Sequence, residues 1–263
     1  MMVAGDVTYH FNKEHLYGLI RIERPEKHNA ISDDMICSFY KAIQNAKANQ
    51  SKCLVITGAG ERMFSSGGDL RDLNIDLSVD EAYRKLSNMQ VVLQEILAFP
   101  VPVICLLNGD ALGGGCEIAT ACDIRIAKEG TKFGFVQSTI GITPAWGGGA
   151  ILYEKVHPSF AFHWLTQGKI YSDRLLEKKG WIHERIPEVK WDSLEEIIAP
   201  YLQKSRQLLQ TLKRQYQDKL SLEKLIGEME NEVKQCSTLW HTKEHIHAVN
   251  RFLKGKQLHK LKH

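Results

Sequence analysis

The stretch that decides the fold is Asn108-Gly109-Asp110-Ala111-Leu112-Gly113-Gly114-Gly115-Cys116-Glu117. It follows the apolar run Val103–Leu107, which is typical of a buried strand, and leads into small residues typical of a helix. Glycines at such a junction let a ligand atom approach backbone N–H groups at the positive end of the helix dipole. The bend can therefore hold an oxyanion, although three glycines alone also fit a tight turn.

A second glycine bend also follows a buried strand. The apolar run Cys53–Ile56 precedes the sequence Phe64-Ser65-Ser66-Gly67-Gly68-Asp69-Leu70. Loops at the carboxyl ends of neighbouring strands are where α/β proteins build ligand sites. An oxyanion hole needs two convergent N–H donors, and each of these bends could supply one.

Glu117 is the ionisable residue nearest to the first bend. It lies three residues after Gly114, in the first turn of an otherwise apolar helix. A carboxylate beside an oxyanion site can act as a general acid or base. The helix dipole also favours a glutamate at a helix start, so both interpretations stay open.

Strand and helix patterns alternate through the first part of the chain, which predicts an α/β fold. After about Trp191 only helical patterns remain, so we expect a core over residues 1–190 and a helical C-terminal subdomain over 191–263. The predicted strands cover residues 7–11, 16–22, 53–56, 103–107 and 124–127. One predicted helix begins after Ser32. The other predicted helices cover residues 80–99, 193–203, 206–220, 221–236 and 242–253.

Composition excludes several classes of protein. The 263 residues carry 34 basic and 31 acidic side chains, a balance that disfavours a nucleic-acid binder. Neither a nucleotide-binding GxGxxG nor a GxxxxGK[ST] motif occurs. The six cysteines form no CxxC pair, which indicates free thiols in a reducing compartment. No secretory signal or membrane-length apolar run is visible, so we expect a cytoplasmic protein without a membrane partner.

One short motif matches a metal-binding pattern. His241-Thr-Lys-Glu244-His245 has the HxxEH spacing of inverted zinc proteases. It lies among polar C-terminal helices without a clear third ligand. We therefore interpret it as a solvated helix face and expect no metal site.

Several motifs together resemble the crotonase superfamily, also called enoyl-CoA hydratase/isomerase. The resemblance covers most of the chain, from residue 23 to residue 256, with the motifs in the right order and spacing. They are ERPEKHNAIS (23–32), FSSGGDL (64–70), NGDALGGGCEIATACDIRIA (108–127), KFGF (132–135), GITPAWGGG (141–149) and RFLKGK (251–256).

The resemblance implies a fold and a substrate class. It implies a crotonase (ClpP/crotonase-like) fold of repeated ββα units with two roughly perpendicular sheets. The helical C-terminal region would form homotrimers, often paired into hexamers. Members bind acyl-coenzyme A, as in fatty-acid metabolism, and stabilise the thioester enolate. No metal or redox cofactor is implied, because coenzyme A enters as part of the substrate.

The matching motifs also imply roles for individual residues. Gly68 and Gly114 would donate the two oxyanion N–H bonds, and Glu117 matches the first catalytic glutamate. Trp146 could wall the acyl pocket or be an ordinary core aromatic, and Asp69 could orient substrate or cap a helix. The other candidates for contact with the substrate or coenzyme A are Lys27, Ala30, Ser66, Leu70, Arg71, Phe252 and Lys254 or Lys256.

The sequence departs from the hydratase pattern at one position. The second catalytic glutamate of hydratases corresponds to Gln137 here, counting back from Gly141. An amide neither gives nor takes a proton near neutral pH, so hydration by two glutamates is in doubt. Mitochondrial-type enoyl-CoA isomerases also use an acid at this position, so that activity is in doubt too.

Three hypotheses about function remain from the sequence. Decarboxylation of a malonyl-type (ethylmalonyl or methylmalonyl) thioester is favoured, because loss of carbon dioxide itself generates the enolate. The TACDIR, KFGFV and GITPAWGG segments resemble the ethylmalonyl-CoA decarboxylase branch. In that reaction Glu117 would be the ionisable group and Gln137 would orient substrate or water. The alternatives are hydration or isomerisation through Glu117 and a non-catalytic, oligomeric acyl-CoA-binding protein.

Overall fold

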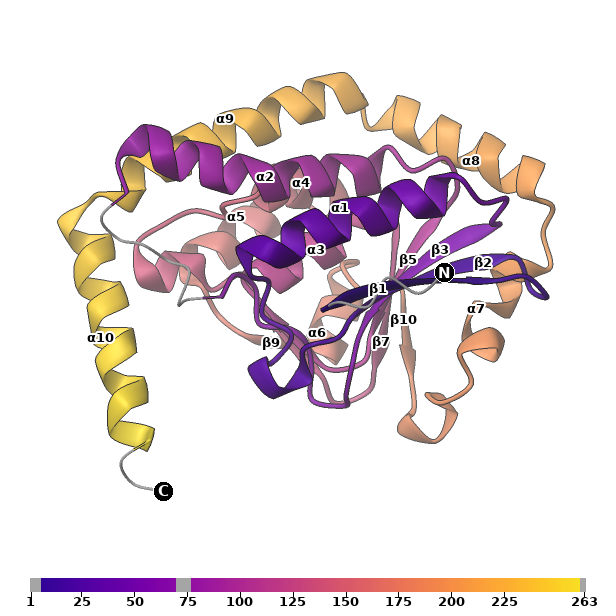
Figure 1. The fold of residues 1–263 in the computed structure, drawn as a ribbon, viewed down its shortest axis with the longest axis horizontal. Helices are drawn as coiled ribbons and strands as arrows, with labels where there is room; N and C mark the ends of the chain where they lie inside the picture. The colour runs from indigo at the N-terminus through magenta and orange to yellow at the C-terminus, as the bar shows by residue number, and fades with distance from the viewer. Residues whose placement is uncertain (1–5, 70–76, 261–263) are drawn as a thin grey trace.

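The computed structural model describes residues 6–69 and 77–260 (Figure 1). Within these residues the strands form one sheet of six strands and one of four. Helices cover both faces of the larger sheet. The candidate residues Leu70 and Arg71 lie outside the described residues.

The larger sheet has the order β1-β2-β3-β5-β7-β10. Only the β1–β2 pair is antiparallel, and the other neighbours are parallel. β3 and β5 are buried along their whole length, which explains their continuous apolar sequences. The strands are β1 (Val7–Asn12), β2 (Tyr17–Ile22), β3 (Cys53–Gly58), β5 (Val103–Leu107), β7 (Ile124–Lys128) and β10 (Glu184–Ile186).

The smaller sheet has the order β4-β6-β8-β9. Its strands are two or three residues long, too short for a hydrophobic pattern to predict them. β4, β6 and β8 each follow a strand of the larger sheet and precede a helix, which confirms the repeated ββα units of the crotonase fold. The strands are β4 (Met63–Ser65), β6 (Asp110–Leu112), β8 (Lys132–Gly134) and β9 (Tyr171–Ser172).

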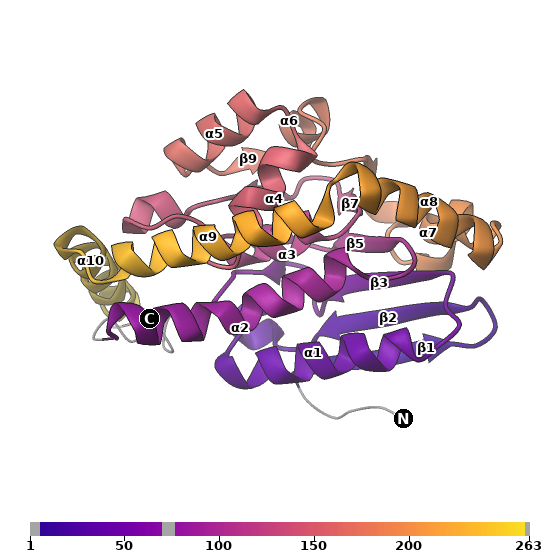
Figure 2. The same ribbon diagram turned by 90° about the horizontal axis from the view of Figure 1, so that it is seen from above.

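Two apolar layers join the helices to the larger sheet. On one face, side chains of the sheet pack with α1 (Asp33–Lys47), α2 (Val79–Leu97), α3 (Gly114–Ala121) and α9 (Leu222–Trp240). On the other face they pack against α7 (Leu194–Leu202). α2 and α9 lie side by side although they are far apart in sequence (Figure 2).

Of the remaining helices, η1 lies near the N-terminus and the others lie in the second half of the chain. α10 extends away from the body of the molecule (Figure 1). None of the helices in the described part of the chain has the length and apolar character needed to span a membrane. These helices are η1 (Pro25–Lys27), η2 (Gln137–Ile140), α4 (Gly148–Lys155), α5 (Pro158–Gln167), α6 (Asp173–Lys178), η3 (Glu188–Lys190), α8 (Arg206–Lys219) and α10 (Lys243–Lys260).

The predicted elements and the observed ones agree in type and differ at their ends. α9 and α10 continue beyond the residues at which the sequence predicts their ends, 236 and 253. The division into a core and a subdomain stays a prediction, and α9 packs directly on α2 and α4. All six cysteines are free thiols; five are buried and Cys37 is exposed.

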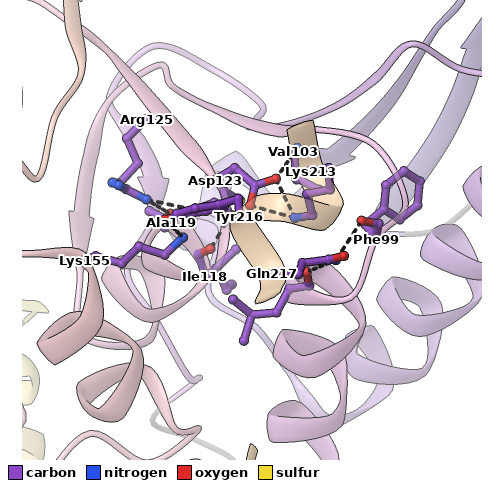
Figure 3. Close-up of polar contacts among 12 residues, drawn as sticks. Phe99, Val103, Ile118, Ala119, Asp123, Arg125, Lys155, Lys213, Tyr216 and Gln217 are labelled. Atoms are coloured by element: carbon purple, nitrogen blue, oxygen red, sulfur yellow. Dashed lines mark hydrogen bonds and ion pairs between the residues drawn. The ribbon is translucent and has the colours of Figure 1, made fainter. Parts of the chain in front are cut away.

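A buried ion pair fastens α8 to the sheet (Figure 3). Lys213 Nζ lies 2.6 Å from both carboxylate oxygens of Asp123, and Asp123 Oδ2 also accepts from Val103 N at 2.8 Å. Lys213 and Asp123 are 3% and 8% exposed. A charge at such depth is tolerated only when it is paired and hydrogen-bonded.

Two further cations lie beside this pair (Figure 3). The Arg125 guanidinium donates to the carbonyl oxygens of Ala119 and Cys122. Lys155 Nζ donates to Tyr216 Oη at 2.8 Å. Burial, followed by the nearby positive charges of Arg125 and Lys213, lowers the pKa of Lys155 to about 7.

We expect Lys213→Met to lower the free energy of unfolding by about 3–5 kcal/mol, because it leaves Asp123 buried without its cation. Urea unfolding measures the change. Lys224→Met is the matched control, because the Lys224–Glu228 ion pair on α9 is exposed. Its effect should stay below about 1 kcal/mol. Equal losses in the two variants would contradict the prediction.

We expect Lys155 to contribute stability that rises with pH from about 7 towards 10. The native Lys155 has a pKa of about 7 and the unfolded residue a normal one near 10.5, so the unfolded form of this residue binds more protons in this window. The slope of the free energy of unfolding against pH should therefore be more positive, by up to about one proton, in the wild type than in Lys155→Met. The exposed Lys219→Met variant should keep the slope. An unchanged slope in Lys155→Met would refute this role.

Candidate active site

The two glycine bends lie against each other. The bend at Gly67 and Gly68 is held by a bridge between Ile31 and Gly68, in which Ile31 N donates to Gly67 O and Asp69 N donates to Ile31 O, both at 2.8 Å. Gly67 has φ +88°, and a Cβ atom added there would lie 2.7 Å from Gly114 N. Only glycine fits both this backbone conformation and this close approach.

The N–H groups of Gly68 and Gly114 donate no hydrogen bond to any described residue. Gly114 is the first residue of α3, so its N–H also lies at the positive end of that helix. Gly114 is buried and Gly68 is partly exposed. The structure thus has two unused backbone donors on adjacent bends, an arrangement that can bind a negatively charged oxygen.

The indole ring of Trp146 lies on both bends. A Cβ atom added to Gly114 would lie 2.1 Å from Trp146 Cζ3, and one added to Gly68 would lie 3.5 Å from Trp146 Cζ2. Trp146 is 7% exposed and belongs to the main apolar core. Trp146 is therefore a core aromatic residue, and its ring also forms one wall beside the two unused donors. These observations are compatible with both interpretations, a pocket wall and an ordinary core residue.

The carboxylate of Glu117 accepts four hydrogen bonds. Oε1 accepts from Gln137 Nε2 at 2.9 Å and from Ala145 N at 3.2 Å. Oε2 accepts from Trp146 N and Gly148 N, both at 2.9 Å. Glu117 lies in the first turn of α3. Its side chain also binds the backbone of the loop before α4 and of the first turn of α4.

Two opposing effects act on this carboxyl. Glu117 is 1% exposed, and this burial raises its pKa above the usual value. The N–H groups of Trp146, Gly148 and Ala145 and the Gln137 amide act in the opposite direction. A carboxyl with a raised pKa can hold a proton closer to neutral pH, where acid–base catalysis is most efficient.

Gln137 connects this carboxylate to a cavity. It lies at the start of η2 and is 6% exposed. Its Nε2 donates to Glu117, whereas its Oε1 is buried and has no partner among the described residues. A cavity of about 620 Å³ adjoins Gln137. The free oxygen can accept a hydrogen bond from water or from a bound molecule.

Asp69 forms an ion pair with a residue that the sequence analysis did not single out. Arg24 Nη1 lies 3.0 Å from Asp69 Oδ2 and also donates to Ala30 O at 3.1 Å. Asp69 is 8% exposed, so the pair is buried. Asp69 therefore holds the turn before Ala30 against the bend at Gly67 and Gly68, and neither suggested role, substrate orientation or helix capping, accounts for this contact.

The other candidate residues differ in exposure. Lys27 is exposed at the end of η1, Ala30 is buried, and Ser66 is partly exposed with its N–H donating to His28 O at 3.0 Å. Phe252, Lys254 and Lys256 lie on α10, and their side chains are outside the described part of the chain. Their contacts with coenzyme A stay predictions.

The interpretation of the HxxEH segment as a solvated face was wrong for one residue. His241 and Glu244 are exposed, but His245 is fully buried against Trp240. Its Nδ1 donates to Ile140 O at 2.7 Å. This hydrogen bond satisfies the carbonyl oxygen of Ile140, and His245 thereby holds η2 in place. Among the residues that the structure describes, no group of three or more His, Cys, Asp or Glu side chains could hold a metal ion.

A second carboxylate lies close to Glu117 and was missed from the sequence. Glu232 of α9 accepts from Gly149 N at 3.1 Å and from Ala150 N at 2.7 Å. Burial and the charge of Glu117 raise its pKa well above the usual value. Residues 117 and 232 are far apart in sequence, and Glu232 lies in a polar helix, so no motif or spacing points to it.

The comparisons with known proteins agree with this geometry. The family model of enoyl-CoA hydratase/isomerase matches residues 14–260, and the chain belongs to this crotonase family of acyl-CoA enzymes. The crystal structure of enoyl-CoA hydratase from Bacillus halodurans has the same fold, with a TM-score of 0.85 and 24% identity. This match covers 94% of this chain and 100% of that one.

Curated relatives differ in their reactions. Crotonyl-CoA hydratase of Syntrophomonas wolfei is 36% identical over 185 residues, which cover 68% of this chain and 71% of the relative. Ethylmalonyl-CoA decarboxylase of Xenopus laevis is 34% identical over 148 residues, covering 56% of this chain and 49% of the relative. The match to the decarboxylase thus spans about half of that protein's length.

We expect Gly114→Ala to lower stability by about 1–3 kcal/mol, because its Cβ would overlap the Trp146 ring. Thermal and urea unfolding measure the loss, and Trp146→Ala in the same chain should restore part of it. Gly227→Ala is the control, since no atom lies within 4 Å of the added Cβ on α9. It should be neutral or stabilise by up to about 1 kcal/mol. Strictly additive effects at Gly114 and Trp146 would contradict the contact.

Proposed function

We propose that this enzyme decarboxylates a malonyl-type acyl-CoA, such as an ethylmalonyl or methylmalonyl thioester. The observation that carries the proposal is the Glu117–Gln137 contact. By the sequence resemblance, Gln137 matches the position of the second hydratase glutamate, so an amide stands there in place of a carboxyl. An amide supplies hydrogen bonds but no proton. The reaction must therefore proceed with Glu117 as the only acid or base of this contacting pair.

Decarboxylation suits these residues. The thioester oxygen binds the N–H groups of Gly68 and Gly114, which also stabilise the negative charge of the enolate. The bond between the α-carbon and the carboxylate breaks, and carbon dioxide leaves. The electron pair of that bond forms the enolate. The α-carbon then takes a proton from the Glu117 site, so no base has to remove a carbon-bound proton.

Trp146 limits the space for the acyl group. Its ring lies on the same two glycines that would hold the thioester oxygen. A bulky aromatic at this point leaves room for a short acyl substituent and excludes water from the enolate. We infer that the preferred substrates carry small α-substituents.

Hydration of an enoyl thioester is the second candidate. The identity to crotonyl-CoA hydratase of Syntrophomonas wolfei favours it, and Glu117 would then act as the acid or base. A non-catalytic acyl-CoA-binding protein is the third candidate. The raised pKa of the buried Glu117 argues against this third candidate, because binding alone does not require a titratable carboxyl beside the two donors.

The remaining parts of the proposal concern binding and assembly. Lys27, Ala30 and Ser66 of the N-terminal turns would contact the coenzyme A portion, together with Phe252 and Lys254 from α10. Coenzyme A would enter only as part of the substrate, with no other cofactor. A homotrimer or a hexamer made of two trimers would bring α10 of one subunit towards the site of its neighbour.

Mass spectrometry of protein incubated with ethylmalonyl-, methylmalonyl- and crotonyl-CoA tests the reaction. We expect loss of carbon dioxide from the malonyl-type thioesters and little hydration of crotonyl-CoA. Glu117→Gln should slow decarboxylation by about 10²–10⁴-fold. Rapid hydration without carbon dioxide release would refute the proposal, and so would full activity of Glu117→Gln.

Gln137→Glu tests the position of the second acid. The variant places a carboxyl 2.9 Å from Glu117 Oε1, where the amide nitrogen now lies, and should raise crotonyl-CoA hydration at least about tenfold. Ser138→Ala is the matched control on η2, because Ser138 lines the same cavity but makes no contact with Glu117. Failure of Gln137→Glu to gain hydratase activity would mean that Gln137 does not occupy the site of the acid.

A further inference from the structure

Glu232 and Glu117 bind consecutive N–H groups of one helix turn. Gly148 N donates to Glu117 Oε2 at 2.9 Å, and the next two N–H groups, of Gly149 and Ala150, donate to Glu232. α4 begins at Gly148, so both carboxyls lie at its positive end. α3 and α9 thus each place one carboxyl against the same turn.

Two glycines make this approach possible. A Cβ atom added to Gly148 would lie 2.4 Å from Glu117 Cγ, and one added to Gly149 would lie 2.4 Å from Glu232 Oε2. A side chain at either position would push a carboxyl away from the helix turn. Gly148 and Gly149 therefore accommodate the two carboxyls, whereas Gly147 is required by its φ of +91° and by its contact with Met229.

The two carboxyls are not equivalent in their hydrogen bonds. Glu117 accepts from three backbone N–H groups and the Gln137 amide, whereas Glu232 accepts from Gly149 N and Ala150 N and has the Gly147 N–H as a third, weaker donor. Donors stabilise the ionised form, so the charge is favoured on Glu117. A second negative charge at the same turn is costly because no Lys or Arg of the described residues pairs with either carboxyl.

We propose that Glu117 and Glu232 form a pair that holds one proton at neutral pH, with the charge on Glu117 and the proton on Glu232. Glu232 thereby becomes the acid that Gln137 cannot be. The inference deepens the proposed function, on which its catalytic consequence rests. When the enolate forms, the pair gives its proton to the α-carbon, and the electron pair of the enolate forms the new C–H bond. The pair is left doubly ionised and regains a proton from water.

The cavity of about 620 Å³ provides access for that water. Glu232 and Gln137 both line it, and the buried Oε1 of Gln137 has no partner among the described residues. Water in the cavity can donate to this oxygen and contact Glu232. The cavity therefore links the proton-carrying carboxyl to the residue that contacts Glu117.

Other titratable groups face the pair without neutralising it. Burial, followed by the charge of Glu117, raises the pKa of Glu232 well above the usual value, which supports the assignment of the proton. When Glu232 is ionised, its charge raises the pKa of Tyr153 on α4 and of Cys236 on α9. The nearby groups are Cys116 on α3, Tyr153 and Glu154 on α4, and Glu228 and Cys236 on α9.

Infrared difference spectra recorded against pH test the pair directly. We expect the wild-type protein at pH 7 to show the C=O band of a buried, protonated carboxyl. The band should be lost in Glu232→Gln. In Glu117→Gln it should remain but titrate at lower pH, because the neighbouring negative charge is gone.

Glu228→Gln is the matched control, one turn earlier on α9 and facing the same cavity. It should leave the band and its midpoint unchanged. Absence of the band in the wild type at pH 7 would overturn the pair, even where a variant fails to fold. Persistence of an unshifted band in folded Glu232→Gln would overturn it as well.

Activity provides a second readout that distinguishes the two proposals. In Glu232→Gln, kcat for decarboxylation should fall about tenfold at pH 8 relative to Glu228→Gln, with little change in KM, because proton delivery and not binding is lost. Equal kcat at every pH would refute the catalytic role of the pair. If no variant and no wild type releases carbon dioxide, the proposed function fails, while the infrared band still decides whether the pair exists.

Discussion

The four hydrogen bonds to the Glu117 carboxylate hold the site together. They join the start of α3 to the loop before α4, and this loop carries Trp146. Because the loop backbone is fixed by the carboxylate, the Trp146 ring is held on Gly68 and Gly114. One buried carboxyl therefore positions the Trp146 ring relative to the two unused backbone donors. This also means that a change at residue 117 alters geometry as well as protonation.

The protein stabilises two of its buried acidic sites in different ways. Asp123 has a direct cation, Lys213, and the pair fixes α8 to the sheet. Glu117 has no such cation among the described residues and relies on N–H dipoles. A lysine beside a carboxylate strongly stabilises the charged form. Neutral N–H donors stabilise it less, so protonation of the carboxyl costs less free energy. The difference separates a structural carboxylate from one suited to acid–base chemistry.

The sequence predicted five of the six strands of the larger sheet and the two bends because each has a local signal, but it missed the three-residue β10. Cys53–Gly58 and Val103–Leu107 are continuous apolar strands, and the glycines of both bends are required by backbone conformation and close approach. The smaller sheet was not predicted locally, since strands of two or three residues have no period to detect. Arg24 and Glu232 were missed for another reason. Each acts through a contact that only the tertiary fold creates, with Asp69 and with the N-terminus of α4.

Side chains of the C-terminal helices contact the residues around Glu117. The predicted division into a core and an oligomerisation subdomain did not include these contacts. α9 brings Glu232 to the first turn of α4, and α10 brings His245 Nδ1 to the carbonyl oxygen of Ile140, the last residue of η2. Gln137 begins that same short helix, so its contact with Glu117 depends on a loop that α10 holds. Burial lowers the pKa of His245 and so favours the neutral ring, and the carbonyl oxygen of Ile140 selects the tautomer that carries its proton on Nδ1. Residues beyond 220 thus contribute side-chain contacts to the loop and the helix turn that surround Glu117.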